Sequence, residues 1–249
     1  MFTGIIEEMG SITNLIKSSV PSWEDPTKVV PGYTFTISSP TGLPLQDAYL
    51  GASIAVSGIC LTATSLDPQT KTFSVGVAAE TLRLTTLGPI VDEMEAAGGT
   101  AESYPANVHP VNLERAAAIG GRNSGHNVQG HVDCVATITE KRQEGDSIVY
   151  KLAIDNLELQ KFIVSKGFVA VDGVSLTVCE TGDGWFTIMM VRHTQDCVTM
   201  GKKEVGEKVN IETDCIAKYS VGVVSGLEEK IERLEKRVRE LEVTEFNRE

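Results

Sequence analysis

Two histidines are the side chains best suited to move a proton at neutral pH. His126 and His131 lie in the run GHNVQGHV (125–132), and a glycine precedes each of them. An unperturbed imidazole has a pKa near ~6.5, so it exchanges protons close to physiological pH. The alternative for both residues, and more so for His126, is a structural role in which the ring bonds to nearby backbone groups.

A metal site is a weaker interpretation of the same run. Asp133 is the only further candidate ligand nearby, on the same face of an expected strand as His131. The five cysteines (Cys60, Cys134, Cys179, Cys197 and Cys215) show no CxxC spacing. Their odd number indicates a reducing compartment rather than a disulfide framework or a structural zinc site. We therefore predict no metal and, with no apolar leader or membrane-spanning run apparent, a cytoplasmic location.

The chain carries one pattern twice. The run SIAVSGICLTAT (53–64) returns as FVAVDGVSLTVC (168–179), and FSVGVAAETLRLTTLG (73–88) returns as FTIMMVRHTQDCVTMG (186–201). In the same order VNLE (111–114) matches VNIE (209–212), and TGII (3–6) matches QGHV (129–132). Such a repeat predicts two copies of one fold with two similar pockets.

The two copies differ at polar positions, which suits two unequal pockets. The differing pairs are Cys60 and Ser175, Ser57 and Asp172, Ser53 and Phe168, Glu80 and His193, Ala79 and Arg192, and Ile5 and His131, whereas Thr62 and Thr177 agree. A cysteine in a strand is most often a small core residue. No GxSxG, P-loop or GxGxxG motif accompanies these residues, so hydrolase, kinase and nicotinamide dehydrogenase functions have no support.

Short strands are expected to position these residues. Runs rich in Val, Ile, Thr and Phe alternate with Gly, Pro and Asp breaks, at 2–7, 33–38, 53–64, 72–79 and 108–114 in the first copy and at 131–140, 147–154, 168–179, 185–192 and 207–212 in the second. This spacing predicts a small closed barrel for each copy. The dipeptides SG (57–58) and DG (172–173) predict a tight hairpin or a bulge. We expect short helices at 80–83 and 156–164, and a surface loop at 89–105.

After Gly226 the sequence takes on the pattern of a coiled coil. The apolar residues Leu227, Ile231, Leu234, Val238 and Leu241 follow the spacing of a and d positions. A lone amphipathic helix is marginal in water, so this stripe needs a partner. Because the opposite face is almost wholly Glu, Lys and Arg, self-association is the preferred interpretation, and packing on the chain's own barrels is the alternative.

Length and charge set the outer limits. A chain of 249 residues holds two domains of ordinary size, and the repeat predicts domains at 1–124 and 125–219 followed by an oligomerisation helix at 220–249. The net charge is −12, and no basic cluster occurs before the tail. Nucleic acid and an anionic membrane are therefore not expected as partners.

Several of these motifs together resemble the riboflavin synthase family. They are MFTGIIEE (1–8), SIAVSGICLT (53–62), ETLRLTTLG (80–88), VNLERA (111–116), GHNVQGHVD (125–133) and KGFVAVDGVSLTV (166–178). The resemblance runs from residue 1 to about 219 and is closest to the fungal members. It implies an all-β fold of two similar six-stranded antiparallel Greek-key barrels from an internal duplication, to which the coiled-coil pattern adds a C-terminal α-helix.

The resemblance also implies an activity that needs no cofactor and no metal. Members of the family are homotrimers that convert two molecules of 6,7-dimethyl-8-ribityllumazine into riboflavin and 5-amino-6-(D-ribitylamino)uracil by transfer of a four-carbon unit, the last step of riboflavin biosynthesis. Donor and acceptor are the same compound, which accounts for similar pockets with different polar groups. The active site is expected between the first barrel of one subunit and the second barrel of a neighbour. The alternative is a non-catalytic lumazine- or flavin-binding chromophore protein, although such relatives lack the Cys60 and paired-histidine motifs.

The ligand contacts that the resemblance implies fall into two sets. In the first barrel they are Gly4, Ile5, Ile6, Cys60, Leu61, Thr62, Gly76, Val77, Ala78, Ala79, Glu80 and Thr81. In the second barrel they are Gly130, His131, Val132, Lys166, Asp172, Ser175, Leu176, Thr177, Met189, Met190, Val191, Arg192, His193, Thr194 and Asp214. Backbone groups are expected to bind the pyrimidinedione edge, and threonine and acidic side chains the ribityl hydroxyls.

Chemical roles follow as hypotheses. His131, or His126 relayed by a neighbour, is the expected base that removes a proton from the C7 methyl group of one lumazine. Ser53, Cys60 or a water molecule that they hold is the expected nucleophile that adds to C7 of the second lumazine. Phe2 and Thr3 are expected to close over the acceptor. Ser57 stands where the family usually has Asn, a difference expected to loosen that turn.

Overall fold

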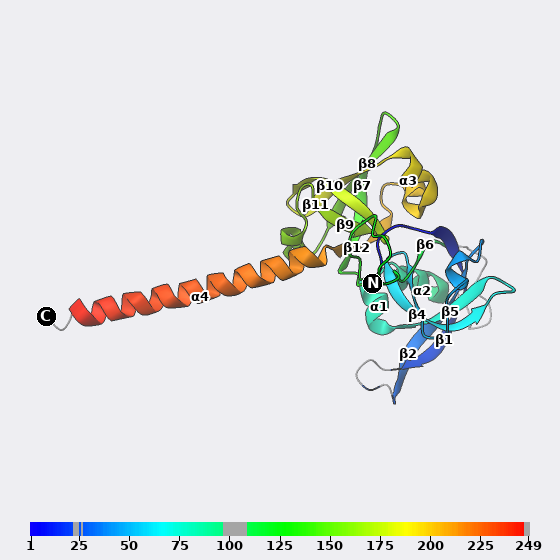
Figure 1. Ribbon diagram of the computed structural model, residues 1–249, viewed down its shortest axis with the longest axis horizontal. Coiled ribbons are helices and arrows are strands. Elements are labelled where there is room, and N and C mark those ends of the chain that lie inside the picture. The colour runs from blue at the N-terminus through cyan, green and yellow to red at the C-terminus, as the bar shows by residue number, and fades with distance from the viewer. Residues whose placement is uncertain (22–24, 26, 97–108, 247–249) are drawn as a thin grey trace. The chain divides into compact units, whose positions relative to one another are not determined.

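The computed structural model describes residues 1–21, 25, 27–96 and 109–246 (Figure 1). Two closed six-stranded antiparallel barrels make up one compact unit, Met1–Asp214, and a long helix lies in a second unit, Cys215–Glu249. The predicted fold class of two duplicated barrels and a C-terminal helix is therefore confirmed.

The first barrel is built from β1 (Glu8–Pro21), β2 (Val29–Ser38), β3 (Ser53–Val56), β4 (Ile59–Asp67), β5 (Thr72–Ala78) and β6 (His109–Arg115). Its strands are hydrogen-bonded in the order β1-β2-β5-β4-β3-β6. The barrel closes where β6 returns to β1, with Leu113 opposite Glu8.

The second barrel repeats this topology. Its strands are β7 (Cys134–Glu144), β8 (Ser147–Ile154), β9 (Phe168–Val171), β10 (Val174–Gly182), β11 (Trp185–Met190) and β12 (Lys208–Thr213). Read from β7, the order around the barrel is β7-β8-β11-β10-β9-β12, the same as in the first barrel. The repeat in the sequence is therefore a repeat of the whole strand arrangement.

Equivalent tight hairpins join β3 to β4 and β9 to β10. Ser57 and Gly58 have φ angles of 45° and 78°, and Asp172 and Gly173 have φ angles of 46° and 81°. Positive φ at both central residues defines a type I′ turn, whose twist matches that of the flanking strands. The two turns meet between the barrels, because a Cβ added to Gly58 would lie 2.6 Å from the backbone nitrogen of Gly173.

Each barrel encloses its own hydrophobic core. Large side chains with 1% exposure or less fill both, among them Leu15, Phe35, Phe73, Val75 and Leu113 in the first and Tyr150, Leu152, Phe186, Ile188 and Ile211 in the second. Burying each such side chain contributes about 1.5–3 kcal/mol to folding. A third small cluster, Phe2, Ala55, Val128 and Ala170, packs between the barrels.

Two expectations about the first copy are wrong. The strand expected at 2–7 does not form; β1 begins at Glu8, because Gly4 has a φ of 77° and takes the backbone out of the extended conformation. The loop expected at 89–105 is a helix in its first part, α2 (Leu87–Ala96). Leu87 and Met94 of α2 are buried against the first core. Residues 97–105 lie outside the described residues.

The helix expected at 80–83 is α1 (Ala79–Leu84), directly after β5. Helix α3 (Arg192–Cys197), which the sequence did not predict, occupies the equivalent place after β11. The helix expected at 156–164 is a 3-10 helix, Leu157–Phe162, and the side chain of Asn156 caps it by accepting a hydrogen bond from the backbone N–H of Glu158.

Helix α4 (Cys215–Phe246) has 32 residues and is described by itself. Its apolar residues Leu227, Ile231, Leu234 and Val238 are 52–55% exposed. Because these residues are three or four apart, they form one stripe along the helix. No helix in the described part of the chain is long and apolar enough to cross a membrane.

Candidate active site

Two short segments lie where the barrels meet, and we call them the straps. The N-terminal strap is residues 1–7, and the second strap is residues 125–132. The backbone N–H of Phe2 donates to Val128 O at 2.6 Å, and that of Val128 donates to Phe2 O at 3.1 Å. This antiparallel bridge joins equivalent residues of the two repeats, so the straps are related by the internal duplication.

Each strap crosses to the barrel of the other repeat. The backbone N–H of Ser175, on β10, donates to Gly4 O at 2.8 Å, and that of Cys60, on β4, donates to Gly130 O at 2.9 Å. A Cβ on either glycine would lie 2.6 Å from the Cβ of the residue opposite, and φ is positive at both. Glycine is therefore required for the close approach of strap and strand.

The straps pack differently from the predicted grouping of their residues. Gly4, Ile5 and Ile6 were expected in the first pocket, but Ile6 packs against the core of the second barrel. Gly130, His131 and Val132 were expected in the second, but Val132 packs against the core of the first. The crossing joins residues that are far apart in the sequence, which the repeat pattern alone does not reveal.

The first candidate site is therefore formed by β4, the end of β5, the start of α1 and the second strap. Cys60, Leu61 and Thr62 come from β4, with Leu61 buried and Thr62 exposed on alternate faces. Ser53 lies opposite Thr62 on β3. The other predicted members on this side follow one another along the chain: Gly76, Val77, Ala78, Ala79, Glu80 and Thr81. Among these, Glu80 is paired with Arg83 at 2.7 Å on the exposed side of α1.

The second candidate site is formed by the equivalent elements and the N-terminal strap. Ser175, Leu176 and Thr177 come from β10, and Phe168 lies opposite Thr177 on β9. The end of β11 and the start of α3 supply the remaining predicted members, which are Met189, Met190, Val191, Arg192, His193 and Thr194. Lys166 joins this set through its backbone N–H, which donates to Val178 O at 2.8 Å.

His126 contacts a polar side chain of the second candidate site. Its Nδ1 lies 2.7 Å from Ser175 Oγ, and its ring stacks on Phe168 with centroids 5.1 Å apart. Burial lowers the pKa of His126 below its ordinary value, and the nearby charge of Asp214 opposes this in part. The imidazole is therefore neutral at pH 7 and able to exchange a proton with the serine hydroxyl.

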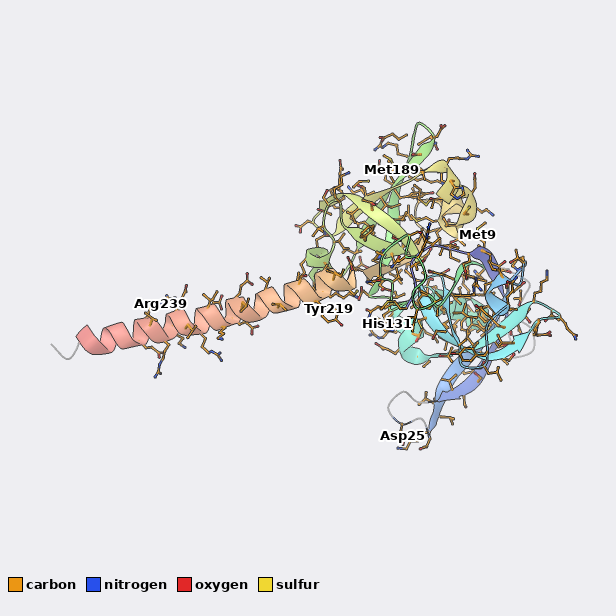
Figure 2. The ribbon with its side chains drawn as sticks, in the orientation of Figure 1. Met9, Asp25, His131, Met189, Tyr219 and Arg239 are labelled. Carbon is orange, nitrogen blue, oxygen red and sulfur yellow. The ribbon has the colours of Figure 1, made fainter. Side chains whose placement is uncertain are left out.

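His131 lies in a different environment. Its side chain is exposed, and its backbone N–H donates to Glu212 at 2.9 Å. Figure 2 shows His131 near the junction of the barrels and Met189 at a separate place on the second barrel. The two histidines thus belong to different sites, because His131 follows the residue that contacts Cys60.

Three other predicted residues make structural contacts. Asp172 is in the turn between the barrels, where its carboxylate accepts the Asn210 backbone N–H at 2.7 Å and faces Lys203 at 3.7 Å. Burial raises the pKa of this carboxyl group. Phe2 is 1% exposed in the small junction cluster. Thr3 donates its hydroxyl to Glu114 at 2.8 Å.

Asp133 also has a structural use. Its carboxylate accepts the backbone N–H and the hydroxyl of Thr213 at 2.8 and 2.9 Å. In the first repeat Glu7 likewise accepts the backbone N–H of Arg115 at 2.9 Å. Within the described part of the chain, no group of three or more His, Cys, Asp or Glu side chains is arranged to hold a metal ion.

The sequence reasoning did not single out Glu114 and Glu212. Both are buried, with 4% and 3% exposure, and both bind the backbone of a strap. The signal that would have found them is the repeat of VNLE and VNIE. In each motif a buried strand position that is ordinarily apolar carries a carboxylate.

Comparisons with known proteins agree with this geometry. The family profile described as "Lumazine binding domain" matches residues 3–95 and 129–214. The chain is 40% identical to riboflavin synthase of Schizosaccharomyces pombe over 90% of this chain and 94% of that protein. It is 38% identical to riboflavin synthase of Bacillus subtilis over 88% and 87%.

A solved structure with the same fold is LumP complexed with 6,7-dimethyl-8-(1'-D-ribityl) lumazine. It matches with a TM-score of 0.65 at 21% identity, over 86% of this chain and 99% of that one. At this identity the likeness concerns the fold alone. Taken with the two profile matches and the full-length relatives, the duplicated barrels identify the chain as a member of the lumazine-binding riboflavin synthase family.

Proposed function

We propose that this protein is a riboflavin synthase. It converts two molecules of 6,7-dimethyl-8-ribityllumazine into one riboflavin and one 5-amino-6-(D-ribitylamino)uracil by moving a four-carbon unit between them, the last step of riboflavin biosynthesis. The observation that carries this proposal is 40% identity to an enzyme of that name over 90% of the chain. The reaction uses no cofactor and no metal, because the substrate supplies both the nucleophilic and the electrophilic carbon.

The duplication supports a reaction between two copies of one compound. Each barrel offers equivalent pocket strands, β4 and β10, so each can take the same ring system. The polar side chains differ, with Cys60 in one barrel where Ser175 stands in the other. One pocket can therefore favour the donor and the other the acceptor. A threonine occupies the equivalent position in each barrel, Thr62 in the first and Thr177 in the second. Both suit the ribityl hydroxyls, which the two substrate molecules share.

A histidine serves as the base in this proposal. The C7 methyl group of one lumazine is acidic because its anion delocalises into the pteridine ring. His126 suits the second-barrel ligand, since it is neutral and lies 2.7 Å from Ser175 Oγ, which can relay the proton. His131, beside Cys60, suits the first-barrel ligand. A positioned base contributes about 10²- to 10⁴-fold in rate.

A nucleophile activates the second lumazine in the next step. Cys60, Ser53 or a water molecule between them adds to C7 of this lumazine, the carbanion of the first then attacks C6 of the remaining C6=N5 imine, and the added nucleophile leaves C7 in the later elimination. Cys60 is a free, half-buried thiol. Ring closure and elimination then divide the atoms into one riboflavin and one diaminopyrimidine product. Orientation of two stacked rings is worth roughly 7–11 kcal/mol of the barrier.

We further propose a homotrimer held through α4. The exposed stripe of Leu227, Ile231, Leu234 and Val238 supports this, because an isolated helix with such a stripe gains stability only when the stripe is covered. Residues 1–124 and 125–219 would act as the lumazine-binding barrels and 220–249 as the oligomerisation helix. The active site would form between barrels of neighbouring subunits. The odd number of cysteines, without CxxC spacing, supports a cytoplasmic enzyme.

The decisive experiment is to mix the purified protein with 6,7-dimethyl-8-ribityllumazine alone and to follow absorbance and fluorescence. We expect riboflavin to appear without any added cofactor, at one mole per two moles of substrate consumed. Binding of the lumazine without riboflavin formation would identify a chromophore-binding protein and overturn the catalytic assignments.

Single variants then separate the roles. Cys60→Ser is expected to lower turnover, whereas Cys197→Ser, at an exposed thiol of α3, is the matched control and keeps it. His126→Ala and His131→Ala are compared side by side. Turnover of His131→Ala within a few-fold of wild type would exclude His131 as the base and leave the pair of His126 and Ser175.

A further inference from the structure

Two buried glutamates hold the straps in the same way. Glu212, on β12, accepts the backbone N–H groups of Gln129, Gly130 and His131 at 2.7, 2.8 and 2.9 Å. Three consecutive donors of one segment therefore point at a single carboxylate. Bonds of this kind, from neutral N–H groups to an ionised acceptor, are roughly twice as strong as neutral ones.

Glu114, on β6, makes the equivalent set of bonds in the first repeat. It accepts the backbone N–H and the hydroxyl of Thr3 at 2.6 and 2.8 Å, and the backbone N–H of Gly4 at 3.0 Å. The N–H of Ile5 donates to the Thr3 hydroxyl at 3.3 Å. The Thr3 hydroxyl is thus the third donor to the carboxylate. In the other strap, the third donor is a backbone N–H group.

These bonds decide where the straps lie. Burial raises the pKa of Glu114, and its bonds to Thr3 and Gly4 oppose that effect. A buried carboxylate without donors would be strongly unfavourable, and so would strap N–H groups without acceptors. Each glutamate and its strap therefore stabilise one another, and removal of the carboxylate frees the strap to move.

Each strap carries the effect of its glutamate to the opposite barrel. Glu212 belongs to the second barrel. In the strap that it holds, Gly130 O accepts the backbone N–H of Cys60, in the first barrel. Glu114 belongs to the first barrel. In the strap that it holds, Gly4 O accepts the backbone N–H of Ser175, in the second barrel. We propose that Glu114 and Glu212 are positioning residues that act crosswise, each setting the geometry and the ligand affinity of the site in the opposite barrel. The affinity part rests on the proposed function, whereas the geometric part does not.

Hydrogen exchange of the full-length protein tests the geometric part. In Glu212→Gln the amide keeps one acceptor oxygen but turns an NH₂ group toward the N–H donors. We expect the Cys60 amide to exchange about 10- to 100-fold faster, and the Ser175 amide to stay within about two-fold of wild type. Glu114→Gln is expected to give the opposite pattern. Glu158→Gln, at an exposed glutamate, is the control that changes neither.

Thr3→Val is a milder variant that keeps the proposal testable if a glutamate variant fails to fold. It removes one donor to Glu114 and leaves the carboxylate in place, so only the Ser175 amide should exchange faster. Acceleration of both amides together in these variants, of neither, or of the amide in the glutamate's own barrel would overturn the proposal.

Ligand affinity separates this inference from the proposed function. If wild type forms riboflavin, both Gln variants should raise the KM for lumazine about 10-fold with a smaller change in kcat, and Glu→Asp should recover part of the loss. An unchanged KM with accelerated exchange would overturn the affinity part alone. If wild type forms no riboflavin, the crossed exchange pattern still decides whether the glutamates position the straps.

Discussion

Burial sets the protonation state of His126, and this has a measurable effect on stability. Its folded pKa lies below 6.5, the value expected when unfolded, so the unfolded chain binds more protons just below pH 6.5. Stability from this group is present above that pH and is lost as the pH falls toward the folded pKa. We expect the His126 ring to titrate below pH 6.5 by NMR. In His126→Asn the decline of Tm between pH 6.5 and 5 should be shallower, and an equal decline would contradict this account.

Ser57 offers a second prediction at the residue scale. It has a φ of 45°, and its hydroxyl accepts the Asn112 N–H at 3.2 Å, whereas Asp172 accepts the equivalent N–H at 2.7 Å. Asn tolerates positive φ and extends its acceptor as Asp172 does. Ser57→Asn should therefore stabilise the protein by about 0.5–1 kcal/mol, seen as a Tm higher by about 1–4 °C. Ser57→Ala keeps the strain and loses the bond, so its Tm should fall; a higher Tm for the alanine variant would refute this.

At the scale of elements, the second strap is the most sensitive segment. Gly130→Ala would place a Cβ 2.6 Å from Cys60 Cβ at a φ of 79°. The strap must move, and a shift of about 1 Å in a positioned group costs about 10²-fold in rate. Gly145→Ala is the matched control, since Gly145 also has positive φ but no atom within 4 Å of an added Cβ. Equal riboflavin formation by the two variants would show that the strap does not position the site.

Local patterns predicted most elements, and long-range contacts account for what they missed. The SG and DG dipeptides gave the type I′ hairpins because positive φ is a property of the turn itself. The segment 89–105 is predicted as a loop because it has no counterpart in the second repeat, although the burial of Leu87, Val91 and Met94 in α2 follows helical spacing. The roles of Glu114 and Glu212 could not be read from sequence, since they depend on straps that cross between barrels.

At the scale of the whole molecule, assembly can be separated from folding. Both hydrophobic cores lie within Met1–Asp214, so a change in α4 should leave the barrels intact. Charged residues in the stripe, as in the double variant Ile231→Lys and Leu234→Lys, should give a monomer by light scattering with little riboflavin synthase activity. Glu229→Lys, on the polar face of the helix, should remain a trimer. A trimeric double variant would mean that the barrels associate without the helix.

The back-to-back glycines at the centre of the duplication limit how the two halves can change. Gly58 and Gly173 approach so closely that a methyl group on either would meet the backbone of the other. Neither half can gain a side chain there, whatever happens in its twin. The two glycine positions are thus fixed in both halves, whereas the pockets differ at positions such as Cys60 and Ser175. An engineer who wants unequal halves should therefore randomise positions around Cys60 and Ser175 and leave Gly58 and Gly173 untouched.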